Sequence, residues 1–326
     1  MAITEFQPAD HEEENLSDEC KALLLSFPKE KGWRTLHQYK FQGFWCQAAE
    51  IQSIMAFQNH FQSRDSDVVL ASIPKSGTTW LKALAFAVVN RHRFSIKSHP
   101  LLTSNPHNLV PFLEYKLYAN NQLPDLSTFA EPRLFGTHIP YPSLGTIKKS
   151  NCKIVYICRN PFDTFVSTWH FLNKGKPQSP MSIEEGFDMY CKGIIGFGPF
   201  WEHMLGYWKE SLSRPDKVLF LKYEDMKEDG DHLRRMAKFL EHPFTLEEKR
   251  NGVIEEIEKL CSFDTMKKLD VNKTGIFLKS FESKSLFRKA EVGDWVNYLT
   301  PKMVERLSKV IEERLGGSGL RFKVFS

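Results

Sequence analysis

Short apolar runs recur along the chain, and longer stretches with a helical spacing of apolar residues follow them. Runs rich in β-branched residues, typical of buried strands, occur at 68–73, 133–138, 152–158 and 217–222. Helical spacing occurs at 19–27, 51–61, 78–89, 162–172, 184–196, 199–210, 231–241, 246–260 and 301–314. The alternation predicts an α/β fold in which helices flank both faces of a central parallel sheet.

Two segments depart from this alternation. Residues 1–18 are charged and poor in apolar residues, so we expect a disordered tail ahead of a single domain at 19–326. Histidines and prolines punctuate residues 95–130, which predicts loops and short helices that form a wall of a site.

Composition and charge narrow the class of protein. The 326 residues include 44 basic and 40 acidic ones, a net charge of +4, and this balance argues against a nucleic acid or a membrane as partner. The N-terminus lacks the apolar core of a signal peptide, and no apolar run is long enough to span a bilayer. The six cysteines include no CxxC pair. We therefore expect a cytoplasmic protein with free thiols.

One predicted strand–loop–helix junction has the composition of an anion site. It reads Ile73-Pro74-Lys75-Ser76-Gly77-Thr78-Thr79-Trp80. The free N–H groups of the first helical turn attract an anion, Lys75 adds a full charge, and Gly77 allows close approach. An ordinary turn with a solvated lysine is the alternative. The junction is P-loop-like, but its lysine precedes its glycine, and Ser72 stands where a nucleoside-triphosphate loop needs its first glycine. We expect a phosphate-like anion bound without a metal.

Three further candidates also lie just past predicted strands. His138, Arg159 and Tyr223 each follow a strand, as Lys75 does, and ligands of open α/β sheets bind at that edge. His138 suits general-base chemistry near neutral pH, with a structural histidine as the alternative. Arg159 is a candidate phosphate ligand.

Six segments together resemble the cytosolic sulfotransferases. They are IPKSGTTW (73–80), THIP (137–140), YICRNPFDTFVS (156–167), YED (223–225), LCSF (260–263) and FRKAEVGDW (287–295). Their order and spacing also agree, over residues 30–322. NPHNLVPFLE and WLKALAFAVVNR look most like the plant branch. The resemblance implies 3′-phosphoadenosine 5′-phosphosulfate (PAPS) as co-substrate, with no metal, and sulfuryl transfer to a hydroxyl of a small acceptor.

The resemblance also implies roles for individual residues. The reactive end of PAPS would contact Lys75, Ser76, Gly77, Thr78 and Thr79. Its 3′-phosphate would contact Arg159, Ser167, Arg288, Lys289 and Ala290, and its adenine Trp80, Tyr223, Cys261 and Phe263. His138 would be the general base, while Lys75 would also stabilise the leaving phosphate. An ordinary solvated basic pair is the alternative for Arg288 and Lys289.

The acceptor is less well determined. Candidates for an apolar pocket are Phe41, Phe44, Trp45, Phe171 and Phe197, of which the last two match family pocket positions, although each could be plain core. Phenylalanines favour a flavonol or another phenol, and brassinosteroids, hydroxyjasmonates and desulfoglucosinolates are alternatives. Two other classes stay open: a nucleotide kinase-like phosphotransferase and a non-catalytic nucleotide binder.

Three positions depart from the family pattern. Ala290 replaces the usual glycine, and Gly136 stands where animal relatives carry a lysine two residues before the catalytic histidine. The animal dimer motif survives only in part, in residues 296–305. We therefore expect a monomer or a weak dimer.

Overall fold

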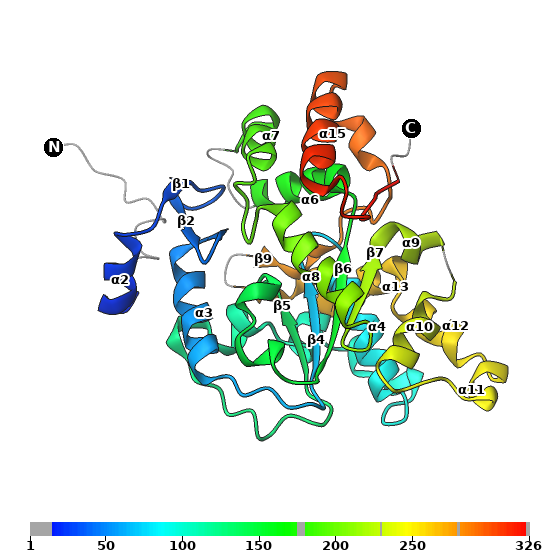
Figure 1. Cartoon of the computed structure of the whole chain (residues 1–326). Coiled ribbons are helices and arrows are strands. Elements are labelled where there is room, and N and C mark those ends of the chain that lie inside the picture. Colours follow the sequence, from blue (N-terminus) through cyan, green and yellow to red (C-terminus); the bar gives the residue numbers. More distant parts are fainter. Residues whose placement is uncertain (1–14, 175–179, 229, 279–280, 324–326) are drawn as a thin grey trace.

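A four-stranded parallel sheet forms the centre of the molecule (Figure 1). The computed structural model describes residues 15–174, 180–228, 230–278 and 281–323. The strands are β4 (Val68–Ser72), β5 (Leu134–Thr137), β6 (Lys153–Cys158) and β7 (Val218–Lys222), in the order β5-β4-β6-β7. The predicted parallel sheet is confirmed, and β4 lies in its interior with Leu70 opposite both Gly136 and Val155.

Side chains of the sheet alternate between two apolar cores. On β4, Val69 and Ala71 belong to one core, whereas Val68 and Leu70 belong to the other. The first core also contains residues of α3 (Ala48–His60), α6 (Pro161–Asn173), α7 (Ile183–Cys191), α8 (Phe200–Ser213) and α15 (Pro301–Leu315). The second contains residues of α4 (Thr78–Asn90), α9 (Tyr223–Glu228), α10 (His232–Phe239), α12 (Val253–Leu260) and α13 (Phe263–Lys268). Both faces of the sheet are therefore covered, as predicted.

Smaller elements surround this framework. Within the described residues, the remaining α-helices are α2 (Asp18–Leu24), α5 (Pro106–Leu109), α11 (Leu246–Arg250) and α14 (Asp270–Thr274). An antiparallel sheet consists of β1 (Lys29–Lys31), β2 (His37–Phe41) and β3 (Phe44–Cys46), and a hairpin of β8 (Ile276–Leu278) and β9 (Phe281–Glu282). Several short helical turns occur between residues 96 and 121, as predicted for the 95–130 segment. No helix in the described ranges is long and apolar enough to cross a bilayer.

Local structure differs from prediction at 246–260 and includes a hairpin at 39–45 that was not predicted. The single helix predicted at 246–260 is two helices, because Gly252 between them has φ +73°. The aromatic segment 39–45 is a hairpin that turns at Gln42 and Gly43, both with positive φ. Tyr223 directly follows β7, as predicted, and begins helix α9. Of the predicted tail 1–18, residues 1–14 lie outside the described residues, and α2 begins at Asp18.

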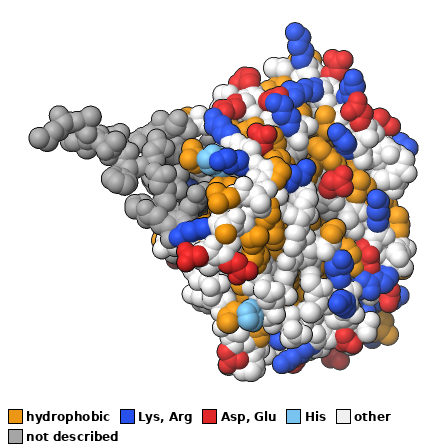
Figure 2. Space-filling view, turned by 60° about the vertical axis from the view of Figure 1, so that its left-hand side comes forward, with side chains coloured by type: hydrophobic (Ala, Val, Ile, Leu, Met, Phe, Trp, Pro, Cys, Tyr) orange, Lys and Arg blue, Asp and Glu red, His pale blue; other side chains and the backbone are white. Residues whose placement is uncertain are grey.

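Charge is distributed over the surface without segregation. Figure 2 shows Lys and Arg interspersed with Asp and Glu on one face, with apolar side chains between them. This pattern agrees with the near-balance of charges in the sequence.

Candidate active site

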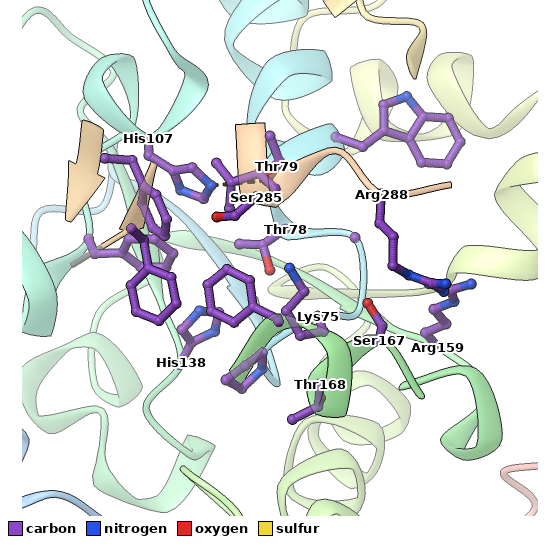
Figure 3. A pocket seen from close by; sticks show the side chains of 18 of the residues that line it. Lys75, Thr78, Thr79, His107, His138, Arg159, Ser167, Thr168, Ser285 and Arg288 are labelled. Carbon is purple, nitrogen blue, oxygen red and sulfur yellow. Dashed lines mark hydrogen bonds between the residues drawn. The ribbon is translucent and has the colours of Figure 1, made fainter. Parts of the chain in front are cut away.

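One large cavity opens at the carboxyl ends of the parallel strands (Figure 3). Its volume is about 1130 Å³. The segments after β4, β5, β6 and β7 contribute Lys75, His138, Arg159 and Tyr223 to its wall. The four residues that the strand ends predicted thus come together at one edge of the sheet.

The loop before α4 is built as an anion cradle. Gly77 caps the helix with φ +106°, and a Cβ there would lie 2.8 Å from the Tyr223 ring and 3.0 Å from Ile157, so only glycine fits. Lys75 also has a left-handed backbone, φ +69°, a strained conformation that is common at ligand sites. The Ser76 hydroxyl is buried and has no hydrogen-bond partner among the described residues, although its side chain does not line the cavity. The loop therefore presents Lys75, Gly77, Thr78 and Thr79 to the cavity, and these are the groups that an oxyanion bound there would contact.

A second cationic group lies before α15. Arg288 and Lys289 both pair with the buried carboxylate of Asp294, at 2.6 and 2.7 Å. Burial by itself raises the pKa of Asp294, but hydrogen bonds from Lys289, Arg288 and Asn297 lower this pKa to about 2. The two cations are therefore held in place by one anion.

Helix α6 anchors the segment that carries these cations. The buried Asp163 carboxylate accepts hydrogen bonds from the backbone N–H groups of Gly293 (2.8 Å) and Trp295 (3.1 Å). The Nη2 atom of Arg159 lies 3.4 Å from Oδ2 of Asp163. The Nε atom of Arg159 has no hydrogen-bond partner in the part of the chain that the structure describes. The anchoring brings the 288–290 segment and Arg159 to the same cavity wall.

Ala290 adopts the conformation that glycine favours. Its φ is +58°, and its carbonyl accepts a hydrogen bond from the Tyr223 hydroxyl at 3.1 Å. An alanine in the left-handed region costs about 1 kcal/mol more than a glycine. The departure from the family glycine therefore adds backbone strain but keeps the loop geometry.

His138 is fixed in the tautomer that a general base requires. Its Nδ1 lies 2.6 Å from the Ser72 carbonyl, which can only accept, so Nδ1 carries the proton and Nε2 keeps its lone pair. Glu114 accepts from the His138 backbone N–H (2.7 Å), and His203 donates to its carbonyl (2.8 Å). Burial lowers the pKa of His138 to about 3, so the imidazole is neutral at physiological pH.

Aromatic rings and two cations form a ladder at the acceptor side. Lys75 Nζ lies 3.9 Å from the centre of the Phe171 ring, and Phe171 stacks on Phe281 at 4.3 Å with an angle of 4°. The Arg34 guanidinium lies 4.2 Å above Phe281. This Arg34–Phe281–Phe171–Lys75 ladder joins the N-terminal sheet region to the anion cradle.

The remaining predicted acceptor residues lie elsewhere. Phe197 is buried behind His138, 5.7 Å between ring centres, and does not line the cavity. Phe41, Phe44 and Trp45 are core residues that also do not line it. The residues predicted to bind the donor that line the cavity are Lys75, Gly77, Thr78, Thr79, Trp80, Arg159, Ser167, Tyr223, Cys261, Phe263, Arg288, Lys289 and Ala290.

Sequence reasoning missed several residues of the site. His107, Glu114 and Tyr115 line the cavity, and Lys82 is buried beside His107. The first three fall in or beside NPHNLVPFLE, a segment that we used only to indicate a branch of the family. Its histidine (His107) and its carboxylate (Glu114) were the features of the sequence that could have indicated site residues. Among the described residues, no group of three His, Cys, Asp or Glu side chains is placed to hold a metal.

Comparison with known proteins identifies the family. Residues 65–319 match the sulfotransferase domain. The chain belongs to the sulfotransferase family. This sulfotransferase is 61% identical to cytosolic sulfotransferase 15 of Arabidopsis thaliana over 325 residues, covering 97% of the chain and 90% of that protein. It is 56% identical to cytosolic sulfotransferase 14 of the same plant, covering 99% and 96%.

Solved structures agree with this assignment. A putative steroid sulphotransferase of Arabidopsis thaliana is 41% identical, covers 99% of this sulfotransferase and 100% of its own chain, and superposes with a TM-score of 0.74. Mouse sulfotransferase SULT7A1, solved in complex with PAP, is 27% identical and superposes with a TM-score of 0.66. The match covers 86% of this sulfotransferase and 95% of the mouse chain. The protein is thus an enzyme of the plant cytosolic sulfotransferase type.

Proposed function

We propose that this sulfotransferase uses PAPS to sulfate a hydroxyl of a small acceptor, with His138 as general base and no metal. The observation that carries the proposal is the 2.6 Å contact between His138 Nδ1 and the Ser72 carbonyl, because it leaves Nε2 as a base beside the anion cradle. The name cytosolic in the Arabidopsis relatives supports a cytoplasmic location.

Two anion sites in one cavity support PAPS as co-substrate. Residues 75–79 would hold the 5′-phosphosulfate, and Arg159, Ser167 and residues 288–290 the 3′-phosphate. The buried Arg159 Nε lacks a partner among the described residues and lines the cavity, and a phosphate oxygen would satisfy this group. PAP in the mouse relative supports the same ligand class.

The residues of the site suit in-line transfer. The acceptor oxygen forms its bond to sulfur while the bond from sulfur to the leaving phosphate breaks, so the protein must position both groups and stabilise charge on the leaving phosphate. Lys75 and the N-terminus of α4 supply that charge. His138 takes the acceptor proton at Nε2, a contribution of about 10²–10⁴-fold.

The lining favours a planar phenolic acceptor such as a flavonol. Phe171, Phe112 and Tyr115 line the acceptor side, and the last two lie 4.7 and 5.9 Å from His138 between ring centres. One observation favours a second candidate: the Arg34 guanidinium lines the same cavity and would pair with the carboxylate of a hydroxy acid such as a hydroxyjasmonate.

An acceptor screen with labelled PAPS in EDTA tests the proposal. We expect a sulfated product from a flavonol, and loss of turnover in Lys75→Ala and His138→Ala while both variants stay folded. His99→Phe, which changes a buried histidine outside the cavity, is the matched control. Turnover of ATP that requires Mg²⁺ would favour a kinase-like phosphotransferase. Binding of PAP without turnover of any acceptor would favour a non-catalytic nucleotide binder.

The same screen separates the acceptor classes. It includes a hydroxyjasmonate, a brassinosteroid and a desulfoglucosinolate. If the acceptor is a hydroxy acid, Arg34→Gln raises its KM and leaves PAPS kinetics unchanged. A substrate profile without flavonols overturns the phenolic assignment and leaves the donor assignment intact.

A further inference from the structure

Three side chains beside the anion cradle form a hydrogen-bond chain that the proposed reaction does not yet use. Lys82 Nζ lies 3.2 Å from His107 Nδ1, and His107 Nε2 lies 2.9 Å from Thr79 Oγ1. Lys82 is fully buried, and His107 is 4% exposed. In Figure 3, His107 lies beside Thr79 and His138 lies below it, and both histidine rings contact the Phe112 ring.

The His107 ring is held in one orientation. Phe112 stacks on one side of it at 5.0 Å with an angle of 17°, and Phe277 contacts it at 5.2 Å. Its backbone N–H donates to Asn105 Oδ1 at 2.9 Å, the cap of helix α5. Because ring and backbone are both fixed, each ring nitrogen has a constant partner.

The hydrogen bonds of the chain run in one direction. Lys82 Nζ lies 3.1 Å from the centre of the Phe112 ring, a contact that favours an ammonium, although burial lowers the pKa of Lys82 well below its usual value. The ammonium and the neutral amine both carry N–H groups, so we assign Lys82 as the donor to His107 in either form. His107 Nδ1 therefore accepts. Burial lowers the pKa of His107 and keeps it neutral, so its one N–H is on Nε2 and points to Thr79. The Thr79 oxygen accepts this bond, and its own hydrogen is left to donate elsewhere.

The cradle is where that hydrogen can donate. Thr79 is the second residue of α4 and lines the cavity, whereas the Thr78 hydroxyl is already bonded to Ser72 at 2.6 Å. We propose that Lys82 and His107 are positioning residues that turn the Thr79 hydroxyl toward the sulfuryl end of the bound donor. The proposal rests on the donor site proposed above.

The tautomer of His107 provides a direct test. In a protein labelled with ¹⁵N-histidine, long-range ¹H–¹⁵N spectra should show the proton of His107 on Nε2, and His107→Gln assigns its signals. A proton on Nδ1 would mean that Thr79 donates to the imidazole, and it would overturn the proposal.

A double-mutant cycle tests the function of the chain. We expect Thr79→Val and His107→Phe each to lower kcat/KM for PAPS about 10-fold, and the double variant also about 10-fold, because His107 acts through Thr79. His107→Gln should restore most of the rate, since an amide can accept from Lys82 and donate to Thr79. Losses that multiply to about 100-fold in the double variant contradict the chain.

Two controls keep this result interpretable. His107→Phe leaves buried Lys82 without its hydrogen-bond acceptor, so the cycle is repeated in a Lys82→Met background. There, His107→Phe should no longer lower kcat/KM. If it still does, the proposed role of Lys82 is overturned. His99→Phe should leave kcat/KM unchanged. Calorimetry of the unmodified enzyme with PAP separates the two proposals: absence of binding overturns the donor site, whereas binding combined with multiplicative losses overturns only the chain.

Discussion

At the scale of single residues, the side chain of Lys82 restricts the size of the side chain that fits at position 136. A Cβ on Gly136 would lie 2.3 Å from both Cε and Nζ of Lys82. The buried lysine of α4 thus fills the space beside Gly136. Where animal relatives carry a lysine at this position, this chain therefore has the amino group of Lys82 in the same region.

Gly136→Ala should destabilise the protein. We expect a loss of about 1–3 kcal/mol in the free energy of unfolding, because the new methyl group overpacks the core and pushes Lys82 away from His107. Urea denaturation measures it. Adding Lys82→Ala should recover part of the loss, and Gly206→Ala is the matched control, since a Cβ there meets nothing closer than 3.5 Å. Equal stability of the two single variants would contradict the steric argument.

Donor affinity should depend on pH through Lys75. Burial, followed by the charges of Lys174, Arg159 and Arg288, lowers the pKa of Lys75 to about 7. The free enzyme therefore loses this positive charge as pH rises above 7, whereas binding an anion requires it. We expect PAP affinity by calorimetry to fall, approaching about 10-fold per pH unit at high pH. Lys75→Arg, which stays protonated, should show a flatter profile whatever its absolute affinity.

At the scale of elements, α6 positions the cations of the 288–290 segment. Asp163→Asn replaces one carboxylate oxygen by an amide that cannot accept from Gly293 or Trp295. We expect PAP affinity to fall about 10-fold or more while the KM of the acceptor changes little. Asp188→Asn, on the exposed ion pairs of α7, is the control. Unchanged PAP affinity in Asp163→Asn would show that the segment holds its position without α6.

Prediction from the sequence succeeded where one period dominates an element. The apolar run before Lys75 and the helical spacing after it correctly predicted β4 and α4. The three-stranded antiparallel sheet went unassigned, because β1 and β3 each have three residues and show no period. Lys82 was missed for a related reason: a lysine within a helix is usually solvated, and only contacts with residues 107, 112 and 136 bury it.

At the scale of the whole molecule, the cavity proposed to bind the donor connects the two cores. Helix α6 belongs to the core on one face of the sheet and α4 to the core on the other, and both contribute to the cavity. A ligand that contacts both helices stabilises the native state as a unit. The monomer or weak dimer stays a prediction.

PAP should therefore raise the melting temperature. At 100 times its Kd, a ligand that binds only the native state adds about 2.7 kcal/mol. Adenosine 5′-monophosphate, which lacks the 3′-phosphate, should give a smaller shift at equal concentration, and Arg288→Ala should reduce the difference between the two nucleotides. Equal shifts in the unmodified enzyme would contradict a 3′-phosphate site at residues 288–290.

The ladder of Arg34, Phe281, Phe171 and Lys75 would make the proposed donor and acceptor thermodynamically dependent on each other. Lys75 lies against the ring of Phe171, and both line the cavity in which we propose that the two substrates bind. An acceptor that shifts Phe171 would change the solvation of Lys75, the proposed donor ligand, and by linkage the donor would change acceptor affinity by the same factor. Substitutions chosen to alter acceptor specificity, such as Phe281→Leu, should consequently also shift the binding curve of PAP.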